Sequence, residues 1–332
     1  MPLREPDNER PGQESDEQSQ STPPIEELTA EISPEAQETV QEFLGEAAQQ
    51  NEAANAELAA GVEDSASANA AAATTATADG QPGGEPYIAF DHVSKSFGTL
   101  EVLRDVSFYV LPGETLCILG RSGVGKSVSL QILMGFLKAD KGEIRVAGEN
   151  ICGFSEVQLQ AIRRKVTMVF QNGALFDSIT VGENVAFPLR ERGDLAEDQI
   201  QQVSKGLLEM VGVAGMEDLL PSDLSTGMKR SVAIARALAA QPEAILYDEP
   251  TTMVDPLMGH LLGGLIGRLK KQLHLTSIVV THDMRFARKL ADRVVFLHEG
   301  EARFFGTMDE MDESEDPVIR EFLALDELVL PV

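Results

Sequence analysis

The chain has 332 residues, enough for one large domain or two smaller ones, and a formal net charge of −27 at pH 7. Seventeen of these net negative charges lie in residues 1–86, where 19 acidic side chains accompany 2 basic ones. This acidity repels polyphosphate backbones and no local basic patch offsets it, so nucleic acid is not expected as a partner.

The cysteine content and the hydropathy indicate where the protein works. Cys117 and Cys152 are too few for a disulfide framework, which favours a reducing compartment. The N-terminal residues do not have the pattern of a signal peptide, and no apolar run approaches the roughly 18 residues needed to span a bilayer. We therefore expect a soluble, cytoplasmic protein that reaches a membrane only through partners.

Residues 1–86 are rich in Glu, Gln, Ala, Ser and Pro and contain almost no aromatic residues. Such a segment cannot bury enough apolar surface to offset the entropy of ordering, so we predict a disordered tail. Its residues 66–84 read as a flexible linker. One stretch, residues 34–58, has good helix formers, with apolar residues near helical spacing at Ala36, Val40, Phe43, Leu44 and Ala47. It is either a helix that docks on a partner or a fluctuating, solvated helix.

From Tyr87 onward the sequence has the pattern of a folded α/β domain. Short apolar runs predict strands at residues 87–90, 106–111, 115–119, 143–146, 244–247, 277–280 and 294–297. Helical spacing predicts helices at residues 128–137, 155–164, 198–211, 228–240, 257–273 and 284–290. Short apolar strands that alternate with helices favour a mostly parallel sheet covered on both faces.

Residues 120–127 read Gly-Arg-Ser-Gly-Val-Gly-Lys-Ser, a complete phosphate-binding loop between a predicted strand and a predicted helix. The glycines let the backbone turn its N–H groups toward the β- and γ-phosphates, and the helix N-terminus adds partial positive charge. Lys126 is expected to reach the terminal phosphates, and the Ser127 hydroxyl to ligate Mg²⁺. The predicted nucleoside triphosphate site comprises Gly120, Arg121, Ser122, Gly123, Val124, Gly125, Lys126, Ser127 and Val128.

A second predicted strand, at residues 244–247, runs directly into the carboxylates Asp248 and Glu249. Asp248 is placed to hold Mg²⁺, either directly or through water. Glu249 is then placed to orient and polarise the attacking water. The residues that follow, Pro250-Thr251-Thr252, strengthen this interpretation because they continue the pattern downstream of a phosphate loop.

Over residues 87–310 the set of motifs resembles that of ABC transporter ATPases. The matching segments, in chain order, are Phe97 for the aromatic residue that stacks on adenine, the phosphate loop, Gln171 for the Q-loop, Leu224-Ser225-Thr226-Gly227-Met228 for the signature motif, Asp248-Glu249, Asp255 for the D-loop and His282 for the switch histidine. The resemblance implies the P-loop fold of that family: a RecA-like parallel sheet core, an antiparallel β subdomain and a helical subdomain at about residues 172–230. Residues 311–332 would be a C-terminal extension.

The resemblance also implies roles for these residues. Two copies would sandwich two ATP molecules head to tail, with Ser225, Thr226 and Gly227 binding the nucleotide held by the other copy and Asp255 at the seam. Gln171 would offer its amide oxygen to Mg²⁺ or to the water. His282 would contact the γ-phosphate and hold Glu249 in place, so that Glu249, His282 and Lys126 form the catalytic set.

Thr226 departs from the pattern because the signature motif usually has glycine there. A Cβ and a hydroxyl then enter a tight turn that faces the phosphate. Either the backbone keeps a negative φ at this position or the signature side of the site is weakened, and the intact Ser225 and Gly227 favour a working site.

Residues 170–189, together with Val128, Met228 and residues 316–323, resemble the ATPases of MCE-type lipid transporters, the Mla/Mkl group. That group moves phospholipids or other hydrophobic molecules, which implies an ATPase subunit on the inner face of the cell membrane, under a permease and with an MCE-domain partner. Leu175 and Phe176 either receive a coupling helix of the permease or pack the helical subdomain. Lipoprotein release, amino-acid uptake, efflux and a non-transport ABC ATPase stay open as alternatives.

Overall fold

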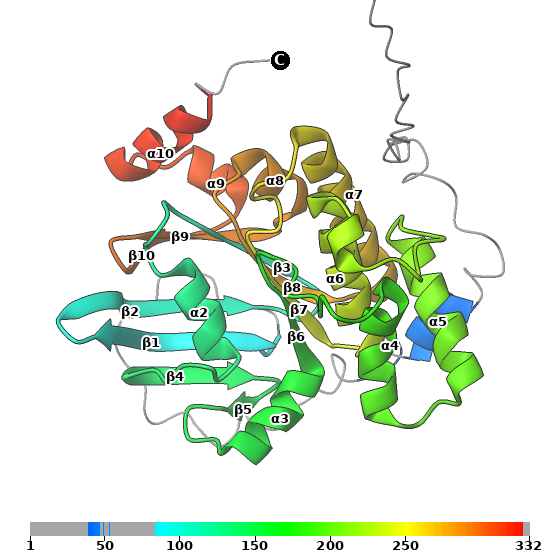
Figure 1. Cartoon of the computed structure of the whole chain (residues 1–332). Coiled ribbons are helices and arrows are strands. Elements are labelled where there is room, and N and C mark those ends of the chain that lie inside the picture. The colour runs from blue at the N-terminus through cyan, green and yellow to red at the C-terminus, as the bar shows by residue number, and fades with distance from the viewer. Residues whose placement is uncertain (1–38, 47–48, 50–52, 54–83, 328–332) are drawn as a thin grey trace, which may run out of the picture.

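The computed structural model describes residues 39–46, 49, 53 and 84–327, in which two β-sheets are flanked by helices (Figure 1). The smaller sheet is antiparallel and has the order β2-β1-β4-β5, with β1 (Ile88–Phe97), β2 (Leu100–Val110), β4 (Lys141–Val146) and β5 (Glu149–Asn150). The larger sheet has the order β10-β9-β3-β8-β7-β6, with β3 (Thr115–Leu119), β6 (Val166–Val169), β7 (Ala244–Asp248), β8 (Thr276–Val280), β9 (Arg293–His298) and β10 (Glu301–Gly306). Its strands are parallel except β10, which pairs antiparallel with β9.

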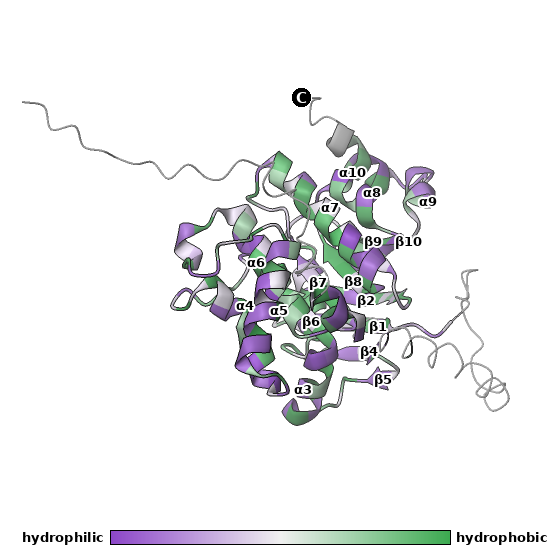
Figure 2. Cartoon of the chain, turned by 90° about the vertical axis from the view of Figure 1, so that its right-hand side faces the viewer, coloured by the Kyte–Doolittle hydropathy of each residue, from purple (hydrophilic) through white to green (hydrophobic). Residues whose placement is uncertain are grey.

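The central strands of the larger sheet are covered on both faces. Every residue of β3, β7 and β8 is buried, which explains why these segments read as continuous, mostly apolar runs rather than alternating ones. Figure 2 shows hydrophobic residues on the central strand β8 and on helix α7 (Pro256–Leu273). The mostly parallel core sheet and the antiparallel β subdomain confirm the predicted fold class.

Three of the helices pack together beside the larger sheet. Helices α4 (Val181–Arg192), α5 (Glu197–Met210) and α6 (Thr226–Ala239) pack on one another and make up a helical subdomain. The other helices are α2 (Lys126–Leu133), α3 (Glu156–Lys165), η2 (Pro221–Asp223), α8 (Met284–Leu290), α9 (Met308–Asp312) and α10 (Pro317–Glu327). Within the described residues, none of these helices is long and apolar enough to cross a membrane.

The sequence patterns do not predict α4, β6, β10 or the two C-terminal helices α9 and α10. Helix α4 contains Gly182 in its first turn and Pro188 in its interior, and both residue types usually mark breaks in a helix. Its start carries a capping box instead: the Glu183 N–H donates to Thr180 Oγ1 at 3.2 Å, and the Thr180 N–H donates to Glu183 Oε2 at 2.8 Å. β6 has four residues, too few for a periodic pattern to stand out.

Residues 39–46 form a helix that packs on the body of the chain (blue in Figure 1). Val40, Phe43 and Leu44 are buried in the same apolar cluster as residues of α4, α5 and α6. The side-chain amide of Gln241 donates to the Phe43 carbonyl, and the Arg192 guanidinium lies 5.4 Å from the centroid of the Phe43 ring. This helix therefore docks on its own chain. Apart from residues 49, 53 and 84–86, the other tail positions, including residues 66–83 of the predicted linker, lie outside the described residues.

A Phe43→Ala variant is expected to release this helix. Truncating a buried Phe costs about 3–5 kcal/mol where the surroundings cannot collapse, and here the segment can instead undock. Amide hydrogen exchange over residues 39–46 should then rise by at least about tenfold, while exchange in the central strands stays unchanged. Gln41→Ala, on the exposed side of the same helix, is the matched control. Unchanged protection in Phe43→Ala would contradict the docking.

Candidate active site

The phosphate loop connects β3 to α2, and its shape depends on glycine. Gly120, Gly123 and Gly125 have φ angles of 146°, 84° and 105°, a region that side chains rarely adopt. A Cβ on Gly120 would lie 2.4 Å from the Leu297 carbonyl oxygen, and one on Gly125 would lie 2.6 Å from a Leu103 methyl group. The loop therefore packs closely against neighbouring strands and leads into the N-terminus of α2, where backbone N–H groups favour an anion.

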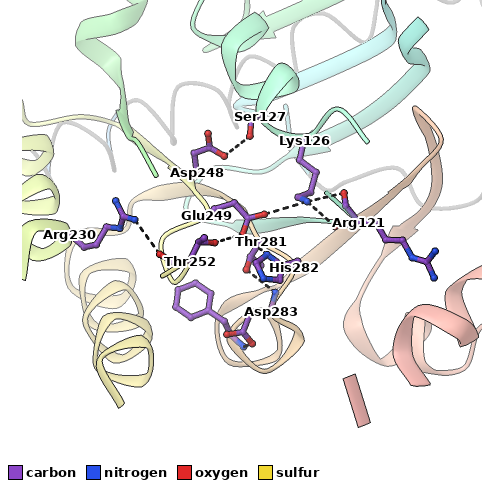
Figure 3. Close-up of polar contacts among 12 residues, drawn as sticks. Arg121, Lys126, Ser127, Arg230, Asp248, Glu249, Thr252, Thr281, His282 and Asp283 are labelled. Atoms are coloured by element: carbon purple, nitrogen blue, oxygen red, sulfur yellow. Dashed lines mark hydrogen bonds and ion pairs between the residues drawn. The ribbon is translucent and has the colours of Figure 1, made fainter. Parts of the chain in front are cut away.

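Lys126 is 5% exposed, and its ammonium group is held inside this loop. Nζ donates to the carbonyl oxygens of Gly120, at 2.8 Å, and Arg121, at 3.2 Å. It also lies 3.4 Å from Oε1 of Glu249 (Figure 3). A positive charge is thus preorganised at the loop that the sequence assigns to phosphate binding.

Ser127 and Asp248 meet at the carboxyl edge of the sheet. Ser127 Oγ donates to Asp248 Oδ1 at 2.8 Å, and Asp248 is the last residue of β7 (Figure 3). Burial raises the pKa of Asp248, the Ser127 hydrogen bond opposes that shift, and the nearby charge of Glu249 adds to it. A hydroxyl and a carboxylate oxygen this close together are ligands of the kind that Mg²⁺ prefers.

Glu249 follows β7 with a left-handed backbone, φ 48°, and its N–H donates to the Val280 carbonyl at the end of β8. Its carboxylate is held by three groups: Lys126 Nζ, the Thr252 hydroxyl, which donates to Oε2 at 3.1 Å, and His282 Nδ1, at 2.7 Å from Oε2. A non-glycine residue in this conformation is strained, and such strain is often kept where it aims a functional side chain. In this structure the three contacts together orient the carboxylate.

His282 lies in the loop between β8 and α8, and its side chain is half exposed. Because Nδ1 faces Glu249, Nε2 is available for a further partner. The histidine lines a cavity of about 690 Å³ together with Arg121, Ser122 and Asp255. Asp255 also caps α7, accepting a hydrogen bond from the Met258 N–H at 3.0 Å. The fold thus gathers Asp255, His282 and two residues of the phosphate loop around one cavity.

Comparison with known proteins identifies the family. The ABC transporter family profile matches residues 103–252. MlaF of Haemophilus influenzae, an intermembrane phospholipid transport ATP-binding protein, is 38% identical over 226 residues, which are 68% of this chain and 86% of the relative. The chain belongs to the ABC transporter family. This agrees with the resemblance of its motifs to the Mla/Mkl group.

Further relatives and a solved structure extend the comparison of this ABC ATPase. Mkl of Mycobacterium leprae, a probable ribonucleotide transport ATP-binding protein, is 37% identical, with 70% of this chain and 67% of the relative covered. The methionine import ATP-binding protein MetN of Rhizobium johnstonii is 41% identical, with 65% and 59% covered. A dimeric structure of the ATP-binding cassette MJ0796, bound to ADP and Pi, is 31% identical with a TM-score of 0.62 and covers 67% of this chain and 98% of that one.

Some predicted site residues of this ABC ATPase lie apart from the cluster. Gln171 is exposed just after β6, and its side chain makes no hydrogen bond to the described residues. Phe97 is exposed at the end of β1, with Lys95 Nζ 5.4 Å from the centroid of its ring. Residues 225–227 do not line the 690 Å³ cavity. Within one copy, the cavity is thus lined by Arg121 and Ser122 of the phosphate loop but not by residues 225–227.

The structure decides between the two alternatives for Thr226. Thr226 is the first residue of α6, and its φ is not positive. Ser225 caps the helix by accepting a hydrogen bond from the Met228 N–H at 3.3 Å. Threonine is therefore accommodated without left-handed backbone. At Gly227 a Cβ would lie 2.7 Å from Cε at the flexible end of the Met258 side chain, which would have to shift to admit it.

Sequence reasoning missed two residues of this ABC ATPase that contact the site. Thr252 holds the Glu249 carboxylate, and Arg230 reaches the Thr252 carbonyl from α6 (Figure 3). The position of Thr252, three residues after Glu249 in a turn, was an available signal. Arg230 had none, because its neighbour Lys229 has the same charge and the pattern does not show which of the two is buried.

Proposed function

We propose that this ABC ATPase drives the movement of phospholipid, or another hydrophobic substrate, through a separate membrane permease. An MCE-domain protein would be its substrate-binding partner, and the chain would lie peripherally on the cytoplasmic face of the membrane through the permease. The observation that carries the cargo proposal is the similarity to MlaF, whose name specifies intermembrane phospholipid transport and most of whose length the chain covers.

The site residues divide the chemistry of ATP hydrolysis among them. Lys126 and the loop N–H groups would bind the phosphates, and Glu249 would direct the attacking water. Ser127, Asp248 and Gln171 would hold Mg²⁺, which neutralises charge on the phosphates when bound. Among the described residues no three His, Cys, Asp or Glu side chains form a metal cluster. Mg²⁺ is usually bound by one or two carboxylates together with waters and substrate phosphates, and Asp248 beside Ser127 would supply the protein's share of such a set.

A second copy of the chain would complete the site. Ser225, Thr226 and Gly227 lie at the N-terminus of the 14-residue helix α6, where backbone N–H groups can bind a phosphate. They do not line the cavity that Arg121 and Ser122 of their own phosphate loop line, which supports a head-to-tail arrangement in which each signature motif faces the partner's nucleotide. The MJ0796 cassette, itself a dimer, is a precedent for such self-association.

An exposed aromatic groove supports a permease partner. Phe176 is 46% exposed, and its ring centroid lies 5.1 Å from that of Phe187 on α4. Both line a cavity of about 330 Å³ that Phe136 and Met168 also line. Leu175 instead packs against the core. Solvent-exposed aromatic rings around a groove suit the apolar face of a helix, as a coupling helix would provide.

A Phe176→Glu variant is expected to lose the permease while keeping ATP hydrolysis by the isolated chain. A carboxylate in an apolar contact is strongly unfavourable unless it is paired, so recovery of the permease with the tagged chain should fall at least about tenfold. Val157→Glu places the same charge at an exposed apolar position of α3 and is the matched control. Equal recovery of the permease with both variants would show that the groove is not the docking site.

The cargo has a rival with its own support. MetN, a methionine import protein, is 41% identical to this chain, against 38% for MlaF, but the match covers 59% of MetN and 86% of MlaF. This similarity fits the alternative of amino-acid uptake. The residues of the ATP site do not discriminate between these cargoes, because they contact only the nucleotide.

The deciding experiment is purification of the detergent-solubilised complex around a tagged Glu249→Gln chain, followed by mass spectrometry. A permease with an MCE-domain protein and bound phospholipid would establish lipid transport. A permease of another kind would keep the ATPase mechanism and discard the lipid cargo. Recovery of the intact dimer without any membrane protein would favour a non-transport role.

A further inference from the structure

Arg230 is a buried arginine of α6, 4% exposed, that the nucleotide chemistry above does not use. Its Nη1 donates to the Phe170 carbonyl at 3.4 Å, and its Nη2 donates to the Thr252 carbonyl at 3.3 Å (Figure 3). Within the described part of the chain it forms no ion pair with a carboxylate, and its Nε has no hydrogen-bond partner. Burial lowers the pKa of this guanidinium. A buried charge without a counter-ion is unfavourable, so the two carbonyl hydrogen bonds are what offsets the cost of burying this guanidinium.

Each of these carbonyls belongs to a functional loop. Phe170 directly precedes Gln171. Thr252 closes the turn after Glu249: its N–H donates to the Glu249 carbonyl at 3.2 Å and its hydroxyl donates to Glu249 Oε2 at 3.1 Å. One guanidinium therefore joins α6, the Gln171 loop and the turn that orients Glu249.

Arg236, on the same helix, contacts the Gln171 loop but not the turn that follows Glu249. Its Nη2 donates to the Gly173 carbonyl at 3.0 Å and its Nη1 to the Ala174 carbonyl at 2.9 Å. The backbone around Gln171 is thus tied to α6 on both sides, by Arg230 before it and by Arg236 after it. Arg236 has no hydrogen bond to the Glu249 turn among the described residues. Of the two arginines, Arg230 is the one that also contacts Thr252, whose hydroxyl holds the Glu249 carboxylate.

We propose that Arg230 is a positioning residue that couples the placement of α6 and the Gln171 loop to the orientation of Glu249. The connection runs from the Arg230 guanidinium to the Thr252 carbonyl and from the Thr252 hydroxyl to the Glu249 carboxylate. Helix α6 carries the signature residues at its N-terminus. A displacement of this helix therefore moves the Arg230 guanidinium relative to the Thr252 carbonyl. Glu249 is then correctly oriented only when the helical subdomain is in place. This coupling is independent of the cargo.

The test compares Arg230→Met and Arg230→Lys with the parent in the full-length chain, by steady-state ATP hydrolysis and by equilibrium ATP binding. Arg230→Met removes both carbonyl contacts, so kcat should fall at least about tenfold while ATP affinity stays within about threefold. Arg230→Lys keeps the charge but cannot span both carbonyls, so its kcat should lie between that of the parent and that of Arg230→Met. Lys205→Met removes an exposed charge of the same subdomain and is the control.

A double-mutant cycle distinguishes positioning from a general structural role. Thr252→Val removes the hydroxyl that holds Glu249, and if Arg230 acts through Thr252 the double variant should be no slower than the slower single variant. Multiplying effects would overturn the proposal, as would a kcat of Arg230→Met within twofold of the parent. If Arg230→Met melts at a lower temperature, Arg230→Lys decides: parental kcat in a stable Arg230→Lys protein would also overturn it.

Discussion

A Glu249→Gln variant is expected to bind ATP with parental affinity and to hydrolyse it at least about 100-fold more slowly, since loss of a general base typically costs 10²–10⁴-fold. The substitution preserves the size of the side chain, and an amide oxygen can still accept the Thr252 hydrogen bond. What is lost is the negative charge that polarises water. The charge attraction to Lys126, 3.4 Å away, is lost as well. Binding and turnover should therefore separate cleanly in this variant.

The measurement is phosphate release by the full chain, alongside equilibrium binding of ATP and the oligomeric state with and without ATP. The variant should accumulate as a dimer when ATP is present, because the step that reopens it is blocked. Glu149→Gln makes the same chemical change at an exposed position of β5 and should behave as the parent. Turnover near the parental rate in Glu249→Gln would remove Glu249 from its assigned role.

A Lys126→Ala variant is expected to fail at the earlier step, nucleotide binding. The ammonium group is buried within the phosphate loop and is held by the Gly120 and Arg121 carbonyls, so it is already in place for an incoming phosphate. A hydrogen bond to a charged group contributes about 1.5–3 kcal/mol, and each 1.4 kcal/mol is a factor of ten in affinity. ATP affinity should therefore drop roughly 10- to 100-fold.

Equilibrium ATP binding and the shift of melting temperature on adding ATP both report this loss. Lys138→Ala, at an exposed position shortly after α2, controls for removing one positive charge near the site. The unliganded melting temperature shows whether Lys126→Ala is folded. An unchanged ATP affinity in a folded protein would contradict the role given to Lys126.

The sequence predicted those parts of the site whose chemistry is contained in a few consecutive residues. The phosphate loop could be recognised because its three glycines, lysine and serine act together over eight positions. Asp248 and Glu249 could be placed because an apolar run predicts where β7 ends. The fold class followed from the alternation of buried strands with helices. In each case the physical requirement acts locally, through backbone conformation or burial of one element.

Other features could not be predicted because their determinants are distant in sequence. The helix at residues 39–46 is marginal by composition, and its docking depends on Arg192 and Gln241, which the fold brings to Phe43 from about 150 and 200 positions away. The periodic pattern of α4 is interrupted by Pro188, and packing on α5 and α6 stabilises the helix nonetheless.

The sequence by itself therefore determined the fold family and the ATPase class of the chain, and it predicted which residues form the phosphate loop. Only the tertiary structure decided how Glu249 is held: by Lys126 at the start of α2, by Thr252 in its own turn and by His282 in the loop after β8. It also decided that Arg230 rather than Lys229 is buried against the catalytic turn. The physical reason is that the free energy of a charged group depends on what surrounds it in space, and residue type alone does not specify those surroundings.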